Sequence, residues 1–176
     1  MLQLKAKPGT RNPRRVCFLG MGNPDYGDDA FGVRLAEELS AAGLANVVIA
    51  GTSPEKFIGR ISEKKFDEVV FLDAVEFGAE PGDLVFLEAA EIKSRFAQIS
   101  THKISLALLA DLAEANGQTK SWLVGVQPES IKAGAPLSAV VQKTLELAKS
   151  VLLHTTLQGA PLQAELSCAG TEEHLC

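Results

Sequence analysis

The sequence predicts a three-layer αβα protein, with helices on both sides of a mostly parallel, twisted five-stranded sheet that has one antiparallel strand at an edge. Short apolar runs of strand length alternate along the chain with longer segments in which apolar residues recur every three or four positions. The length of 176 residues suits one domain. We find no internal repeat and no linker that would divide it.

Five apolar runs are predicted to be strands, at 14–20, 46–50, 68–74, 83–88 and 121–126. The first, third and fifth are almost continuous Val, Leu, Ile and Phe, as expected for strands that are covered on both faces, so we place them at the centre of the sheet. Only the short link EFGAEPG joins the third and fourth runs. It cannot hold a crossover helix, so the fourth strand is predicted to be antiparallel and at an edge.

Four segments are predicted to be helices, at 28–43, 53–64, 104–117 and 136–154. Gly43 and Gly117 are expected to mark helix ends. The pattern places a single α/β domain at 14–154, between a flexible basic arm at 1–13 and a mobile tail at 155–176.

Composition excludes several classes of function. The net charge of −5 argues against a nucleic-acid partner, because affinity for phosphates needs clustered Lys and Arg. No apolar stretch is long enough to span a bilayer, and none has the form of a signal peptide, so we expect no membrane association and a cytoplasmic location. Cys17, Cys168 and Cys176 are too few and too scattered for a disulfide framework, which predicts free thiols.

Ligands bind at the carboxyl ends of the strands in an open α/β sheet, and three connections there carry polar residues. The first, GMGNPDYGDDAFG, places Asp28 and Asp29 at the start of a helix. One of the two can cap the helix, most simply Asp28, which leaves the other carboxylate available. Gly20 and Gly22 suggest a dinucleotide-binding loop, but Asp25 stands where the third small residue is needed and the acidic residues would repel a pyrophosphate.

The other two connections add a carboxylate and an imidazole. Asp73 ends a strand that is otherwise apolar, where a carboxylate is costly unless it meets water, a cation or hydrogen-bond donors; capping of the following turn is the structural alternative. His102 directly precedes the helix predicted at 104–117, whereas His154 and His174 are expected to be surface residues. Two carboxylates and one imidazole leave coordination positions open, and such a set suits Ni, Zn or Fe.

Four blocks in order resemble the hydrogenase maturation endopeptidases, which cut NiFe-hydrogenase large subunits. The blocks are GMGNPDYGDDAFGVRLAEEL, GTSPE, FLDAVEFGAEPGDLVF, and STHKISLALLADL with LVGVQPESI. GTSPE and GVQPE are most similar to the branch that serves formate-hydrogenlyase hydrogenases. Ala30 and Phe31 depart from the family pattern, which usually has glycine directly after the acidic pair.

The resemblance implies a peptidase that removes the C-terminal extension of the large-subunit precursor once nickel is inserted, with nickel as the recognition signal. It assigns metal contact and catalysis to Asp29, Asp73 and His102. The implied partner is the nickel-loaded precursor, and no organic cofactor is expected. Two mechanisms remain open, through the metal or through the carboxylates. A non-catalytic nickel-binding chaperone for hydrogenase assembly is the alternative. A different α/β hydrolase or a nucleotide-binding protein is the third alternative; it would need a GxSxG nucleophile elbow or a phosphate loop, and the sequence contains neither.

Overall fold

The computed structural model describes residues 14–96 and 104–158. Its strands are β1 (Val16–Met21), β2 (Val47–Gly51), β3 (Glu68–Ala74), β4 (Leu84–Glu88) and β5 (Lys120–Val126). Its helices are the short 3₁₀ turn η1 (Gly27–Ala30), α1 (Phe31–Ala41), α2 (Glu55–Glu63), α3 (Ala89–Arg95), α4 (Leu106–Glu114) and α5 (Ala139–Gln158).

The five strands form one sheet in the order β2-β1-β3-β5-β4. All neighbours are parallel except β4, which runs antiparallel to β5 at the edge. The predicted fold class is therefore confirmed, and β1, β3 and β5 occupy the centre as their apolar runs indicated. The short link EFGAEPG does not join adjacent strands, because β5 lies between β3 and β4.

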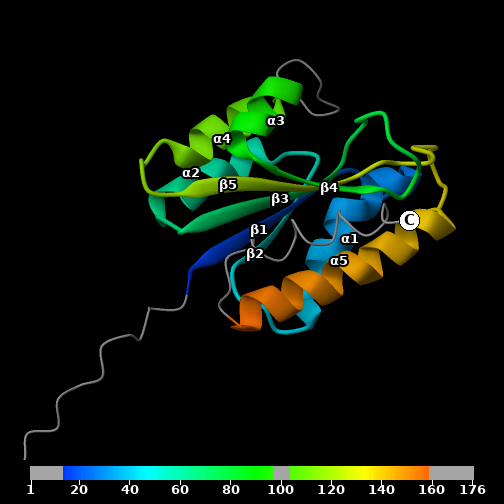
Figure 1. Ribbon diagram of the computed structural model, residues 1–176, viewed down its shortest axis with the longest axis horizontal. Helices are drawn as coiled ribbons and strands as arrows, with labels where there is room; N and C mark the ends of the chain where they lie inside the picture. The colour runs from blue at the N-terminus through cyan, green and yellow to red at the C-terminus, as the bar shows by residue number, and fades with distance from the viewer. Residues whose placement is uncertain (1–13, 97–103, 159–176) are drawn as a thin grey trace, which may run out of the picture.

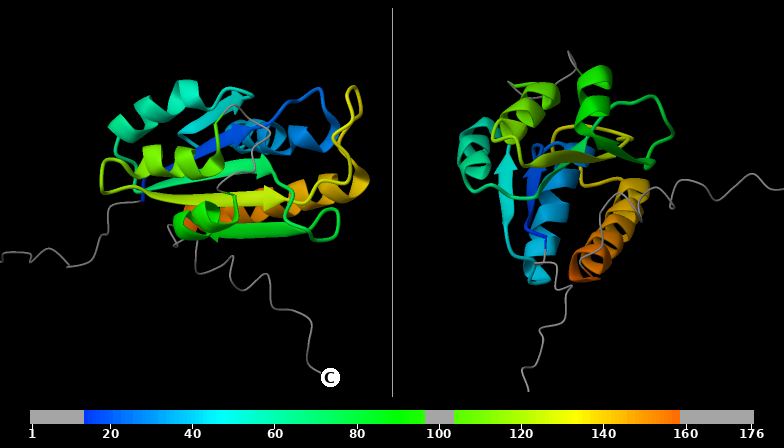
Figure 2. Two further views of the ribbon diagram at one scale, coloured as in Figure 1. Left: turned by 90° about the horizontal axis from the view of Figure 1, so that it is seen from above. Right: turned by 60° about the vertical axis from the view of Figure 1, so that its left-hand side comes forward.

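Helices cover both faces of the sheet (Figure 1). On one face, α1 and α5 pack on the side chains of β1, β3 and β5 that include Phe18, Val70 and Trp122. On the other face, α2, α3 and α4 pack on Leu19, Phe71 and Leu123. The two further views show the same three layers (Figure 2). Alternation of side chains along each strand produces these two separate cores.

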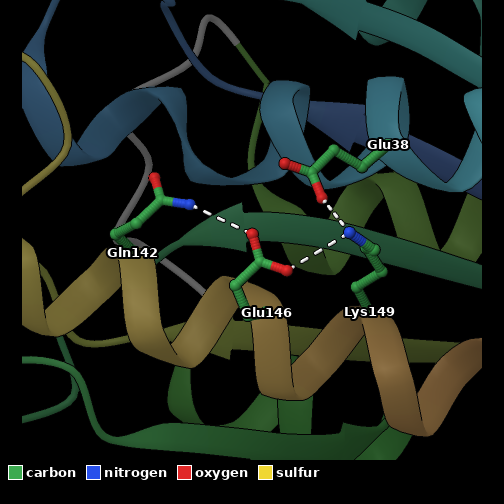
Figure 3. A network of polar contacts seen from close by, with 4 residues as sticks. All are labelled: Glu38, Gln142, Glu146 and Lys149. Atoms are coloured by element: carbon green, nitrogen blue, oxygen red, sulfur yellow. Dashed lines mark hydrogen bonds and ion pairs between the residues drawn. The ribbon is translucent and has the colours of Figure 1, made fainter.

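A polar network joins the outer surfaces of α1 and α5 (Figure 3). The Nζ atom of Lys149 donates to Glu38 Oε2 at 2.7 Å and to Glu146 Oε2 at 3.2 Å. The two carboxylates raise the pKa of Lys149. Gln142 Nε2 donates to Glu146 Oε1 at 3.4 Å, one helical turn away. The network lies over the apolar contact between the helices, where exposed ion pairs contribute little to stability.

The bounds of the predicted elements lie within three residues of the observed ones, and the larger differences concern two helices. Helix α3 was not predicted, because it has seven residues and only Ile92 is buried, too short a segment to show helical periodicity. Helix α5 continues to Gln158, four residues beyond the predicted end. The arm at 1–13 and the tail from residue 159 onward lie outside the described residues, so those expectations stay predictions. Within the part that the structure describes, no helix is both long and apolar enough to cross a membrane.

Candidate active site

Asp29 lies in the connection from β1 to α1, half-buried at the carboxyl end of the sheet. Its Oδ2 atom accepts the backbone N–H of Asn23 at 2.8 Å, which closes the loop on itself. Gly22 has a φ of +115°, and a Cβ atom there would stand 1.8 Å from the carbonyl oxygen of Asp29. The backbone at residue 22 therefore packs directly on Asp29, and only glycine fits there.

Asp28 has a different environment from the one that the sequence suggested. Neither η1 nor α1 has a side-chain cap, so the expectation that Asp28 caps the helix is wrong. Its buried carboxylate instead accepts three backbone N–H groups from the segment between β5 and α5. Oδ2 accepts from Glu129 at 2.9 Å and from Ser130 at 3.0 Å, and Oδ1 accepts from Ser138 at 2.7 Å. The Asp28 side chain thus connects the loop between β1 and α1 to the loop between β5 and α5.

Asp73 is the penultimate residue of β3, and it is only 2% exposed. It alternates with Val70, Leu72 and Ala74, so its side chain belongs to the face that α2, α3 and α4 cover. Its Oδ1 atom accepts the N–H of Ala74 at 3.0 Å. Gly125 of β5 stands opposite it in the parallel register.

The start of α1 and the end of β3 are in direct contact. A Cβ atom at Gly32 would lie 2.0 Å from the carbonyl oxygen of Leu72 and 2.5 Å from that of Met21. Gly32 follows Asp29 by three residues, and Leu72 directly precedes Asp73. The absence of a side chain at residue 32 therefore lets the backbone segments that carry Asp29 and Asp73 approach each other closely.

His102 lies outside the described residues, and its predicted place at this site stays a prediction. The helix that it precedes is described. Helix α4 begins at Leu106 with Ser105 as its N-cap, whose hydroxyl accepts the N–H of Leu108 at 3.2 Å. Helix α4 packs against α2 and α3 and leads into the parallel strand β5. A helix in this connection runs opposite to the strands, so its first turn faces the edge at which β3 ends.

Within residues 14–96 and 104–158, no three His, Cys, Asp or Glu side chains gather as a metal-binding group. The third residue of the predicted metal site, His102, lies outside these ranges. Carboxylates are hard oxygen donors, and Asp29 and Asp73 are the two members of the predicted set that the structure describes.

Sequence reasoning did not single out Gln127, which is 5% exposed and directly follows β5. Its Oε1 atom accepts the backbone N–H groups of Phe77, Gly78 and Ala79 at 3.0, 3.1 and 3.3 Å. Its Nε2 atom donates to Glu76 Oε2 at 2.7 Å. The Gln127 side chain is therefore hydrogen-bonded to each residue of the turn at 76–79, which follows β3 and Asp73. The block GVQPE contains Gln127, but nothing in its pattern indicates these partners.

Comparison with known proteins places these features in context. Residues 33–155 match a family described as hydrogenase maturation protease, a range that includes Asp73 and His102 and begins just after Asp29. The chain is 30% identical over 132 residues to the hydrogenase 3 maturation protease of Escherichia coli strain K12, which covers 73% of this chain and 83% of the relative.

Solved structures show the same architecture. The crystal structure of the [NiFe] hydrogenase maturation protease HycI from Thermococcus kodakarensis KOD1 superposes with a TM-score of 0.72 at 31% identity, over 84% of this chain and 94% of that one. The hydrogenase maturating endopeptidase HybD from Escherichia coli superposes with a TM-score of 0.69 at 29% identity, over 82% and 93% of the two chains.

Proposed function

The chain belongs to the hydrogenase maturation protease family and is a protease, and we propose that it removes the C-terminal extension of a NiFe-hydrogenase large-subunit precursor after nickel insertion. The observation that carries the proposal is the close approach of the Asp29 and Asp73 segments through Gly32. It brings two acidic residues to the carboxyl edge of the sheet, where α/β proteins bind their ligands.

Nickel enters this proposal as part of the substrate. Asp29, Asp73 and His102 would contact the nickel ion that the precursor already holds, so that a precursor without nickel is not cut. Half-burial of Asp29 supports this role, because the residue keeps some exposure to solvent while the Asn23 N–H fixes its carboxylate. Three protein ligands leave positions for the substrate's own ligands.

Hydrolysis adds water across the scissile peptide bond. The oxygen of water joins the carbonyl carbon, the C–N bond breaks, and a proton reaches the leaving amine. In this hypothesis, one carboxylate accepts a proton from the water, or the substrate's metal activates the water, and the metal stabilises the negative charge on the carbonyl oxygen. The buried position of Asp73 supports a role in contacting the substrate's metal, because the attraction between a carboxylate and a cation strengthens away from water.

The test compares nickel-loaded and nickel-free precursor, with intact-mass measurement of the large subunit. We expect the wild-type chain to shorten only the nickel-loaded form. Asp29→Asn, Asp73→Asn and His102→Ala should slow processing about 100-fold or more. Asp25→Asn is the matched control, because Asp25 is an exposed acid in the same loop as Asp29.

Two outcomes would contradict the proposal. Equal cutting of nickel-free and nickel-loaded precursor would remove the role of nickel. An intact precursor in every reaction, together with nickel-dependent binding of the precursor, would instead favour the non-catalytic assembly chaperone.

A further inference from the structure

The connection from β5 to α5 is hydrogen-bonded to both loops of the candidate site, the one that follows β3 and the one between β1 and α1. Gln127, at the start of the connection from β5 to α5, binds the turn after β3 through its side chain. Glu129 and Ser130, two and three residues later, bind the carboxylate of Asp28 through their N–H groups. The two attachments are separated only by Pro128, whose ring fixes its φ angle and limits their relative movement.

The backbone of Gln127 strengthens its attachment. Its N–H donates to the carbonyl oxygen of Asp83 at 2.8 Å, and its own carbonyl oxygen accepts the N–H of Gly82 at 2.9 Å. Gln127 is therefore hydrogen-bonded to residues 76–79 through its side chain and to residues 82–83 through its backbone. The N–H of Val75 also donates to the carbonyl oxygen of Val126 at 2.9 Å, which continues the pairing of β3 and β5 past Asp73.

The chemistry of the side chain is specific to glutamine. One oxygen must accept three N–H groups while the nitrogen donates to a carboxylate. Glutamate would place a second carboxylate 2.7 Å from Glu76, and leucine would leave the N–H groups without this acceptor.

From these contacts we infer that Gln127 is a positioning residue for the protease reaction. It fixes the turn at 76–79, and thereby the end of β3 with Asp73, relative to the connection from β1 to α1 that carries Asp28 and Asp29. This inference rests on the proposed function of the site. Catalytic groups displaced by about 1 Å can lose 100-fold in rate, so the turn matters although Gln127 does not touch the substrate.

The test is an exchange of polarity between two side chains. Gln127→Glu is expected to lower kcat for the nickel-loaded precursor about 10- to 100-fold with little change in KM. The double variant Gln127→Glu with Glu76→Gln keeps the net charge and restores a donor facing an acceptor, because the amide at residue 76 can donate to the carboxylate at residue 127. We expect it to recover kcat to within about threefold of wild type.

Gln142→Glu is the matched control. Gln142 also donates to a glutamate, Glu146, but on the exposed surface of α5 (Figure 3). It should leave kcat unchanged. A purely structural role of Gln127 would lower the amount of folded protein without changing kcat per folded molecule. An unchanged kcat in Gln127→Glu, or no recovery in the double variant, would overturn the inference.

Amide hydrogen exchange separates this inference from the proposed function. In Gln127→Leu, the N–H groups of Phe77, Gly78 and Ala79 should exchange at least about 10-fold faster than in wild type, while core amides of β1 stay protected. If the wild-type chain cuts no precursor, the proposed function fails, and faster exchange at 77–79 still shows that Gln127 holds the turn. Unchanged exchange at these three amides overturns the positioning role.

Discussion

Asp28 and Asp29 are neighbours in the chain, but their carboxylates are bound in different ways. Asp28 is buried and accepts three N–H groups from residues 129–138, whereas Asp29 is half-buried and accepts one N–H from its own loop. Asp28 therefore has a structural role, whereas Asp29 is a residue that stays partly exposed to solvent. Each half of this division can be tested by substitution.

Asp28→Asn should lower the free energy of unfolding by about 2–3 kcal/mol, because its amide nitrogen would face an N–H donor inside the protein. Asp29→Asn should change it by less than about 1 kcal/mol, because the amide oxygen can still accept the Asn23 N–H. Urea unfolding of both variants measures the difference. Equal destabilisation of the two would contradict the division of roles.

Gly32→Ala should destabilise the protein by about 3 kcal/mol or more, because the added methyl group would meet the backbone oxygens of Leu72 and Met21. Gly59 in α2 is the control, since a Cβ atom there has nothing within 4 Å. Gly59→Ala should stabilise the protein by about 0.5–1 kcal/mol. Thermal unfolding measures the stability of both variants. If Gly32→Ala were as stable as wild type, α1 would have to be able to move away from the sheet.

Glu68 should make stability dependent on pH. Burial raises the pKa of Glu68 above 4.5, and the neighbouring Arg14 guanidinium offsets this only in part. Because the folded-state pKa is the higher one, the stability from this carboxyl is present below pH 4.5 and is lost as the pH rises through the folded-state value.

Glu68→Gln removes that titration. The unfolding free energy of the variant should therefore fall less than that of wild type as the pH rises above 4.5. Urea unfolding at a series of pH values between 4 and 7 compares the two proteins at equal ionic strength. Parallel curves for wild type and variant would contradict the expectation.

Cys17 should be unreactive in the folded protein. It is fully buried in β1, and burial raises the pKa of its thiol to about 11, with Lys64 lowering it only partly. In a Cys168→Ser, Cys176→Ser background, a thiol reagent at pH 8 should modify Cys17 more than about 100-fold more slowly than after unfolding in guanidinium. Comparable rates in the two conditions would show that β1 opens readily.

Nickel should remain with the precursor and not with the protease. If it is recognised as part of the substrate, the purified chain should retain far less than one equivalent of nickel after dialysis. Metal analysis of the dialysed protein provides the measurement. Stoichiometric nickel or zinc that survives dialysis would identify a resident metal instead.

Long patterns in the sequence predicted most of the fold. The apolar run at β3 matched the strand bounds, because a strand buried on both faces must be apolar throughout. Helix α3 was missed because its start is set by a local capping box between Glu88 and Glu91, with too few apolar residues to show a period. The position of β5 between β3 and β4 was also not predicted, since chain order does not specify which strands pair.

The sequence by itself determined the element types, the parallel centre of the sheet, and the acidic residues at its carboxyl edge, because hydrophobic periodicity and residue chemistry are local properties. Only the tertiary structure decided what Asp28 and Gln127 bind. Asp28 meets N–H groups 101, 102 and 110 residues away, and Gln127 meets others 48 to 50 residues away. A backbone N–H is nearly the same in every residue, so such a partner leaves no signature in the sequence.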